Sequence, residues 1–253
     1  GPHMTLQKMK RFVYAPDPHG HEVNRPSWKV LIGFCKDFAP DMRILGGDVF
    51  DFVPFRKGAS ESEKEQSMSE DVKIGMELIR EFEATHWCYG NHDIRPARVA
   101  ADGKGPIRDY AKEVVARIDN LCIDLGIQTT AYTAKSYIPI GPVLKAMHGN
   151  IANLHTAYAI AMAYGPTIVG HTHSIDYAQA KSLDRREAWV CGCLRNVWAE
   201  YNETRTATLR HRHGFAFGFY QDHSPEYAVY QAASDERGLW LIPSAFKEYG
   251  HGD

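Results

Sequence analysis

The sequence lacks three features that would place a protein in a class directly: a cysteine framework, a long apolar run and an excess of charge of one sign. Its five cysteines are an odd number without a Cys-x-x-Cys pair, which indicates reduced cysteines in an intracellular protein and no disulfide framework. No apolar run reaches the ~20 residues of a membrane-spanning helix, and no stretch resembles a signal peptide. The net charge of −2 argues against a general binder of polyanions. We therefore expect a cytoplasmic protein without a membrane partner; the sequence leaves its oligomeric state open.

The composition is otherwise that of a globular protein with a substantial core. A hydrophobic fraction of 44% and a charged fraction of 24% are ordinary for this class. The length suits a single domain, which we expect over residues 5–253, because residues 1–4 (Gly-Pro-His-Met) have the form of a cleaved expression tag. The unusual feature is histidine: thirteen against 29 Lys and Arg, which suggests metal chemistry.

Two kinds of apolar segment alternate along the first two thirds of the chain, as in α/β proteins. Residues 56–71 are polar and charged, and this indicates a loop or lid. Helices are expected over residues 27–39, 72–82, 106–125 and 150–164. Strands are expected over residues 11–15, 42–45, 86–89, 142–147 and 167–169, and in the C-terminal part over 189–191, 214–220 and 227–230.

A short polar cluster follows each of the first five expected strands. In α/β sheets the carboxyl ends of strands meet at one edge, so these clusters would bring carboxylates, an amide and imidazoles together. Mixed oxygen and nitrogen ligands suit Mn²⁺, Fe²⁺ or Zn²⁺ better than Ca²⁺, and they exceed what one ion needs. The pattern therefore predicts a site for two metal ions. The clusters are Asp17-Pro18-His19, Gly47-Asp48-Val49-Phe50-Asp51, Gly90-Asn91-His92-Asp93, His148-Gly149 and Gly170-His171-Thr172-His173.

Taken in order, these clusters read D-x-H, GD-x-x-D, GNHD, HG and GH-x-H, and the series resembles the motifs of the calcineurin-like metallophosphoesterase family. The resemblance covers residues 17–173, and the C-terminal part adds a weaker likeness to stand-alone members from phages and bacteria. It implies a four-layer α/β/β/α sandwich, in which two mixed sheets are flanked by helices. It also implies two divalent metal ions as cofactors, with Mn²⁺ preferred and Fe, Zn or Ni as alternatives.

The resemblance also implies which side chains bind the two ions. Asp48 would bridge them, and a hydroxide shared by the ions would attack the phosphorus of the substrate. His171 and His173 would then lie one residue apart because each belongs to a different ion. The first ion would be held by Asp17, His19 and His173, and the second by Asn91, His148 and His171.

The same resemblance implies the catalytic residues. His92, which is not a ligand in the family, would protonate the leaving oxygen or stabilise the charge on it. Asp51 would hydrogen-bond His92 and fix its tautomer. Asn91 and Arg95 are candidates for contact with the substrate phosphate, and an ordinary loop salt bridge is the alternative for Arg95. Four histidines fall outside the motifs and are expected to be ordinary surface or core residues: His86, His155, His211 and His213.

The implied activity is hydrolysis of a phosphomonoester or phosphodiester in a nucleotide or related small molecule. Protein phosphatases of the superfamily carry Arg-Gly after the second Asp, whereas Phe52-Val53 follow here, which disfavours a phosphoprotein substrate. A DNA or RNA nuclease or end-processing enzyme is the alternative. The net charge disfavours binding along an extended phosphate backbone. However, residues 205–213 include three arginines and two histidines, enough to bind nucleic acid phosphates locally. A scaffold without catalysis is a third hypothesis, disfavoured because every motif residue is present.

Overall fold

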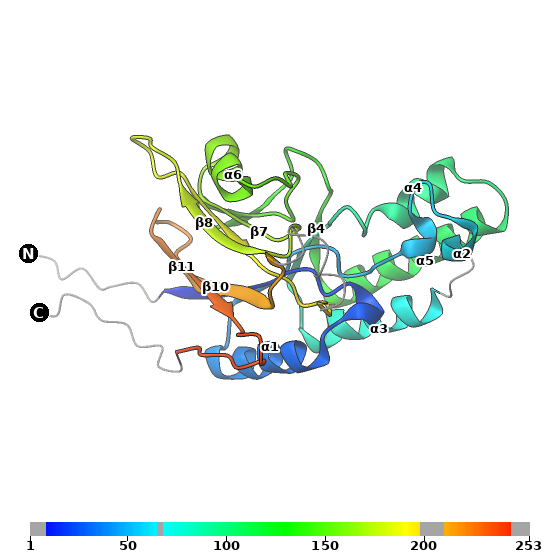
Figure 1. Ribbon diagram of the computed structural model, residues 1–253, viewed down its shortest axis with the longest axis horizontal. Helices are drawn as coiled ribbons and strands as arrows, with labels where there is room; N and C mark the ends of the chain where they lie inside the picture. Colours follow the sequence, from blue (N-terminus) through cyan, green and yellow to red (C-terminus); the bar gives the residue numbers. More distant parts are fainter. Residues whose placement is uncertain (1–8, 65–67, 198–209, 244–253) are drawn as a thin grey trace, which may run out of the picture.

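Two mixed β-sheets form the centre of the computed structural model, which describes residues 9–64, 68–197 and 210–243 (Figure 1). In the first sheet β1, β2, β3 and β4 run parallel, and β10 and β11 extend it by antiparallel pairing; in the second β6, β7 and β9 run parallel, and β5 and β8 are antiparallel to their neighbours. The first sheet has the described strand order β11 (Tyr227–Ala233), β10 (Gly214–Tyr220), β1 (Lys10–Ala15), β2 (Met42–Leu45), β3 (His86–Cys88) and β4 (Gln128–Thr130). The second has the described order β5 (Ile138–Ile140), β6 (Leu144–Ala146), β7 (Thr167–Val169), β9 (Glu187–Cys191) and β8 (Ile175–Gln179).

Helices flank the two sheets. In Figure 1, α1 lies below β10 and β11, whereas α6 lies on the opposite side of the molecule, above β7 and β8. The predicted class, an α/β protein with two mixed sheets flanked by helices, is confirmed. Within the described part of the chain, no helix combines the length and apolar character needed to cross a membrane. The helices are α1 (Arg25–Phe38), α2 (Glu61–Lys64), α3 (Ser69–Glu81), α4 (Arg95–Asp102), α5 (Pro106–Leu125) and α6 (Thr156–Tyr164), with 3₁₀ turns η1 (Gly20–Glu22) and η2 (Val53–Phe55).

Strand β1 shows how one sequence pattern serves both faces of a sheet. Its side chains alternate, so Phe12 and Tyr14 join a buried cluster that also contains Ile168 of the second sheet. Val13 and Ala15 point the other way and join the cluster formed with the helices. All four of these side chains are fully buried. The strand is therefore a continuous apolar run, as expected for a strand covered on both faces.

The ends of two helices differ from the prediction for local reasons. Helix α1 begins at Arg25 because Asn24, rather than Ser27, is its N-cap: the Asn24 Oδ1 accepts the Ser27 N–H at 3.0 Å. Helix α6 begins only at Thr156, because the Thr156 hydroxyl donates to the Asn153 carbonyl at 2.8 Å and holds a turn before it. Four elements have the predicted bounds: 42–45, 106–125, 167–169 and 214–220.

Five described helices and strands were not predicted from the sequence: α2, α4, β4, β5 and β8. Strands β4 and β8 lie at the edges of their sheets and have few buried side chains, so they carry no clear apolar pattern. The segment 56–71, predicted as a loop or lid, contains α2 and the first turn of α3, while 65–67 lie outside the described residues. Residues 1–4, interpreted as an expression tag, and 205–209 of the arginine-containing segment also lie outside them.

Gly75 of α3 generates a stability prediction with a matched control. A Cβ on Gly75 would lie 2.2 Å from Cε1 of Phe50, which is fully buried, whereas a Cβ on Gly33 of α1 would meet nothing within 4 Å. We predict that Gly75→Ala lowers the free energy of unfolding by about 1–3 kcal/mol through overpacking. Gly33→Ala should raise it by up to ~1 kcal/mol through helix propensity. Urea denaturation measures both, and shifts of the same sign would contradict the packing described.

Candidate metal centre

Five strands from the two sheets end at one edge of the molecule, and candidate site residues follow each of them. Strands β1, β2 and β3 run parallel in the first sheet, as do β6 and β7 in the second. Side chains from the two sheets meet at this edge: His148 Nε2 lies 3.1 Å from Asn91 Oδ1, and His19 Nε2 lies 3.3 Å from His173 Nε2. The structure thus brings together all the predicted metal ligands: Asp17, His19, Asp48, Asn91, His148, His171 and His173.

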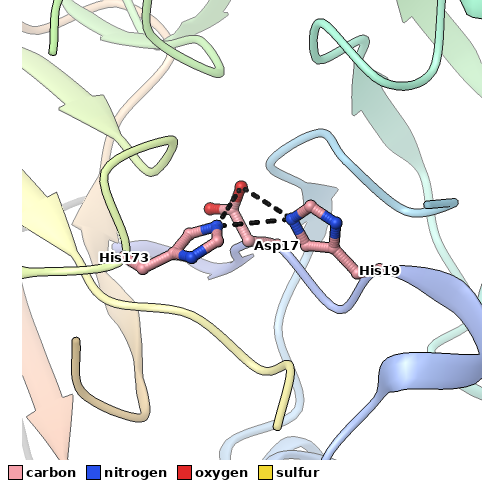
Figure 2. Close-up of side chains that lie close together, drawn as sticks. All are labelled: Asp17, His19 and His173. Carbon is pink, nitrogen blue, oxygen red and sulfur yellow. Dashed lines mark hydrogen bonds and ion pairs between the residues drawn. The ribbon is translucent and has the colours of Figure 1, made fainter. Parts of the chain in front are cut away.

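Asp17, His19 and His173 form the first group, with ligand atoms within 4.8 Å of one another. Figure 2 shows the Asp17 carboxylate between the two imidazoles. Asp17 Oδ1 lies 3.5 Å from His173 Nε2 and 3.9 Å from His19 Nε2. Its other oxygen, Oδ2, accepts the backbone N–H of His171 at 2.9 Å. One oxygen of Asp17 therefore holds the loop after β7, and the other faces the imidazoles.

Asp48, His148 and His171 form the second group, again with ligand atoms within 4.8 Å. Asp48 Oδ2 lies 3.2 Å from His148 Nε2, which lies 3.1 Å from His171 Nδ1. The same Oδ2 is 3.7 Å from His19 Nε2 of the first group. Asp48 Oδ1 accepts the backbone N–H of His92 at 2.9 Å. Asp48 therefore divides its oxygens as Asp17 does, and its Oδ2 faces both groups.

Two hydrogen bonds orient the histidines of these groups. The His19 Nδ1–H donates to Asp51 Oδ1 at 2.9 Å, and the His148 Nδ1–H donates to the Gly46 carbonyl at 2.9 Å. Burial lowers the pKa of His19 to about 4, so its ring is neutral at neutral pH. With Nδ1 protonated, each ring turns Nε2 toward the group. This is the arrangement found around metal-ligating histidines, whose second nitrogen donates to a carboxylate or carbonyl.

Oxygen atoms that can only accept hydrogen bonds lie close together around Asp48, so positive charge would stabilise the site. His148 Nε2 lies within 3.2 Å of both Asp48 Oδ2 and Asn91 Oδ1. Burial lowers the pKa of His148, but the carboxylates of Asp48 and Asp17 raise it more, to about 10. Burial raises the pKa of Asp48, yet His148 holds it well below its usual range. A proton on His148 compensates part of this negative charge. A divalent cation would compensate the charge and satisfy the remaining acceptors.

Asp17 gives the most direct sign of a metal site. The residue is fully buried, and its Oδ1 has no hydrogen-bond partner within the described structure. Burial raises the pKa of this carboxyl, but His148 and His173 bring it below its ordinary value, so the group is ionised at neutral pH. A buried anionic oxygen without a donor is costly unless a cation binds it. The residues present therefore fit a metal ion.

The backbone of the candidate ligands is strained. Non-glycine residues rarely adopt positive φ, and each instance costs on the order of 1–3 kcal/mol, although Asp and His tolerate it better than most residues. Strained positions that converge on one point indicate a functional site. Glycines leave room beside two of the carboxylates: a Cβ on Gly90 would lie 2.2 Å from Asp48 Oδ1, and one on Gly170 2.3 Å from Asp17 Oδ2. The candidate ligands with positive φ are Asp17 (48°), His19 (56°), Asp48 (48°), His171 (71°) and His173 (62°).

His92 lies beside both groups, but its contact with Asp51 differs from the prediction. The His92 Nδ1–H donates to the backbone carbonyl of Asp51 at 2.7 Å, while the Asp51 carboxylate lies 3.6 Å away. Asp51 does hydrogen-bond His92 as predicted, but with its backbone carbonyl and not with its side chain, because the carboxylate turns toward His19 instead. Although burial raises the pKa of Asp51, His19 lowers it to about 2. Asp51 thus orients a candidate ligand with its side chain and His92 with its backbone.

The Arg95 side chain contacts other residues of the protein. It is buried, its Nη1 donates to the Asp51 carbonyl at 3.0 Å, and its Nη2 lies 3.4 Å from His92 Nε2. The guanidinium therefore holds the loop after Asp48 and packs beside His92, in an arrangement different from both the phosphate contact and the loop salt bridge considered from sequence. Asn91, the other candidate for phosphate contact, has its Oδ1 at His148, in the second group.

Two further buried carboxylates hold the ligand loops: Asp71, which the sequence did not single out, and Asp93, which belongs to the GNHD cluster. Asp71, in the first turn of α3, fell at the end of a segment predicted as a loop, and only the helix start could have indicated a role for it. Its carboxylate accepts the backbone N–H groups of Asp51 (3.2 Å) and Phe52 (3.0 Å). Asp93 joins the loops after β2 and β3, because it accepts from the N–H groups of Val49 (3.0 Å), Phe50 (3.2 Å) and Gly90 (2.9 Å) and from Trp87 Nε1 (3.2 Å).

Two aromatic side chains outside the motifs flank the groups. The ring of His211 is centred 5.0 Å from that of His173, and the ring of Tyr132 is centred 6.0 Å from that of His148. His211, expected to be an ordinary histidine, reaches this place through a β-bridge to Ser174. Both residues come from segments without a motif, so nothing in the sequence near them indicated this proximity.

The orphaned Asp17 oxygen leads to a prediction about metal binding. A divalent cation such as Mn²⁺, added at 100 times its Kd, should stabilise the protein by ~2.7 kcal/mol. Asp17→Asn should lose most of this stabilisation, whereas Asp37→Asn, on the exposed face of α1, should keep it. Thermal unfolding with and without Mn²⁺ measures the effect. Equal stabilisation of the wild type and Asp17→Asn would exclude Asp17 as a ligand.

Comparison with known proteins assigns no family to this chain. No protein-family model matches it, and no curated protein matches it. The chemistry of the site therefore carries the functional inference: two buried carboxylates, one of them facing both groups of imidazoles, at an edge where both sheets end.

Proposed function

We propose that this protein is a calcineurin-like metallophosphoesterase, which hydrolyses a phosphomonoester or phosphodiester in a nucleotide or related small molecule with two divalent ions. One observation carries the proposal: Asp48 Oδ2 faces His19 of the first group at 3.7 Å and His148 of the second at 3.2 Å. A single structural ion would need only one group of ligands. Two groups that share a carboxylate suit a pair of ions.

The residues that would hold the ions follow from the two groups. Mn²⁺ is the preferred ion for this mixed donor set, and Fe, Zn or Ni are alternatives. When bound, such a pair lowers the pKa of water and neutralises charge on a phosphoryl group. Asp48 would contact both ions. The first would be held by Asp17, His19 and His173, and the second by Asn91, His148 and His171.

His92 is the side chain best placed to move a proton in the reaction. Its Nδ1–H is engaged with the Asp51 carbonyl at 2.7 Å, so Nε2 is the nitrogen that exchanges a proton with substrate. Its side chain is 20% exposed, so a substrate can reach it, and Nε2 lies 3.9 Å from Asp48 Oδ2. As water adds to phosphorus and the bond to the leaving oxygen breaks, the imidazolium form of His92 gives its Nε2–H to this oxygen, and the proton that the water loses restores the imidazolium. Arg95 acts as a positioning residue for the ring.

The distances alone would also allow His92 to bind a metal, since His19, Asp48 and His92 form a third group within 4.8 Å. A nuclease or end-processing activity is the alternative function, because it uses the same chemistry on a larger substrate. A scaffold without activity is disfavoured, because every residue that the reaction requires is present and directed at the site.

The metal requirement can be measured directly. Carefully purified protein should carry about two divalent ions per chain by elemental analysis. Excess EDTA should abolish hydrolysis of p-nitrophenyl phosphate, and added Mn²⁺ should restore it. Metal content should fall in acid, because histidine must be neutral to bind a metal ion. Full activity in EDTA would refute the proposed chemistry.

His92→Ala tests the assignment of the proton donor. The variant should keep its metal content, and kcat should fall about 10²–10⁴-fold for alkyl phosphates, whose leaving oxygen needs a proton. The loss should be much smaller for p-nitrophenyl phosphate, because p-nitrophenolate leaves without one. His223→Ala, an exposed histidine in the turn between β10 and β11, is the control and should behave as the wild type. Loss of a metal ion in His92→Ala, or equal losses for both substrates, would show instead that His92 is a ligand or a binding group.

A further inference from the structure

A cavity of about 910 Å³ lies beside the first group of candidate ligands and has no part in the chemistry described above. It is formed by the turn before α6, the start of β8, the residues before β10 and those after β11. A phosphoryl group would fill only a small fraction of this space. The volume lies in the range of sites for small organic molecules, roughly 300–1,000 Å³.

His211 connects the cavity to the candidate metal centre. It lines the cavity, and its ring meets that of His173 edge to face, with centres 5.0 Å apart. Ser174, which follows His173 in the chain, also lines the cavity. The Arg212 N–H donates to the His173 carbonyl at 2.9 Å and fixes the wall to the metal centre. A substrate with its phosphate at the metal centre therefore has room for a large substituent beyond His211.

The charges on the wall are mixed. Arg210 and Arg212 face the cavity together with Asp176, Asp235 and Glu236. An extended strand of nucleic acid is bound through many Lys and Arg side chains that contact its phosphates. Among the described lining residues, Arg and Lys do not outnumber Asp and Glu. A wall that carries both hydrogen-bond donors and acceptors favours an uncharged ligand that also carries donors and acceptors, such as a heterocycle with amide edges or a sugar with hydroxyl groups.

The rest of the described lining adds apolar surface. Val190 is fully buried at the wall, Ile175 lies next to Ser174, and Leu154 is 73% exposed at the turn before α6. Small-molecule sites combine such apolar surface with a few polar groups that fix orientation. The cavity therefore offers surface for the faces of a ring and acceptors for its edges.

We infer that this cavity binds the nucleoside of a nucleotidyl phosphodiester, while the phosphate lies at the metal centre. Asp176 and Glu236 accept hydrogen bonds from the base or the sugar, and His211 separates the nucleoside from the phosphate. This inference rests on the proposed function and narrows its substrate class to phosphodiesters that carry one nucleoside. The alternative occupant, a nucleic acid strand, is tested below.

Two substrates with the same charge and leaving group test the inference. Thymidine 5′-(p-nitrophenyl phosphate) and methyl p-nitrophenyl phosphate differ only in the nucleoside. The Mn²⁺-loaded wild type should hydrolyse the nucleotidyl ester with a kcat/KM at least about tenfold higher, the effect of one well-placed contact. The double variant Asp176→Ala/Glu236→Ala should lower this ratio about tenfold. Both carboxylates are exposed, so the variant should fold.

Glu226→Ala is the matched control, because this exposed carboxylate precedes β11 and the cavity residues follow the far end of that strand. It should keep the wild-type ratio. A ratio near one in the wild type, or a ratio unchanged in the double variant, would overturn the inference while hydrolysis of both esters leaves the proposed function standing. Faster cleavage of a labelled single-stranded oligonucleotide than of the nucleotidyl ester would also overturn it, in favour of a strand.

Direct binding separates failure of the inference from failure of the proposed function. Metal-free wild type should bind thymidine with a saturable change in chemical shifts, and the double variant should bind it at least about tenfold more weakly. If neither ester nor p-nitrophenyl phosphate is hydrolysed, the proposed function fails, but this difference in thymidine affinity still supports a nucleoside site. Equal or absent binding in the two proteins would refute the site.

Discussion

The edge where the two sheets meet depends on the division of the oxygens of Asp17 and Asp48. In each carboxylate one oxygen accepts a backbone N–H from another ligand-bearing loop, that of His171 for Asp17 and that of His92 for Asp48, both at 2.9 Å. The other oxygen faces imidazole nitrogens. The carboxylates of Asp17 and Asp48 therefore hold the loops together and concentrate negative charge between them. Both carboxylates are buried. The hydrogen bonds that fix the loops therefore also place negative charge where only a cation can compensate it.

The fold provides this arrangement by ending parallel strands of two sheets at a common edge. The buried side chains of β1 and its neighbours fix the strands, and the loops beyond them are tied by a second layer of carboxylates, Asp71 and Asp93. Each of these accepts backbone N–H groups, so ligand positions are set by hydrogen bonds rather than by loop length alone. His19, His148 and His92 each donate Nδ1–H to an oxygen of the chain. Such fixed orientation is what a site requires if its nitrogens must meet a cation or a substrate oxygen.

The sequence was sufficient for features that repeat or that sit at strand ends. Apolar periodicity located α5 and β7 with their observed bounds, and the order of motifs identified side chains that the fold brings together. It was insufficient where a property belongs to the folded chain only. The partner of the Asp51 carboxylate depends on which imidazole lies closer, and the approach of His211 to His173 depends on a β-bridge near β8. The edge strand β4 escaped prediction because none of its side chains is buried, which leaves no apolar pattern.

The left-handed backbone of the ligand positions has an evolutionary consequence. Glycine adopts positive φ without steric cost, and asparagine at low cost. Where selection at this position is relaxed, replacement of His173 by either residue relieves backbone strain and removes one candidate ligand, so the chain gains stability as the candidate metal site is lost. Mutational drift at such positions therefore favours residues that bind a metal ion less well, and the candidate ligands persist only where selection maintains them.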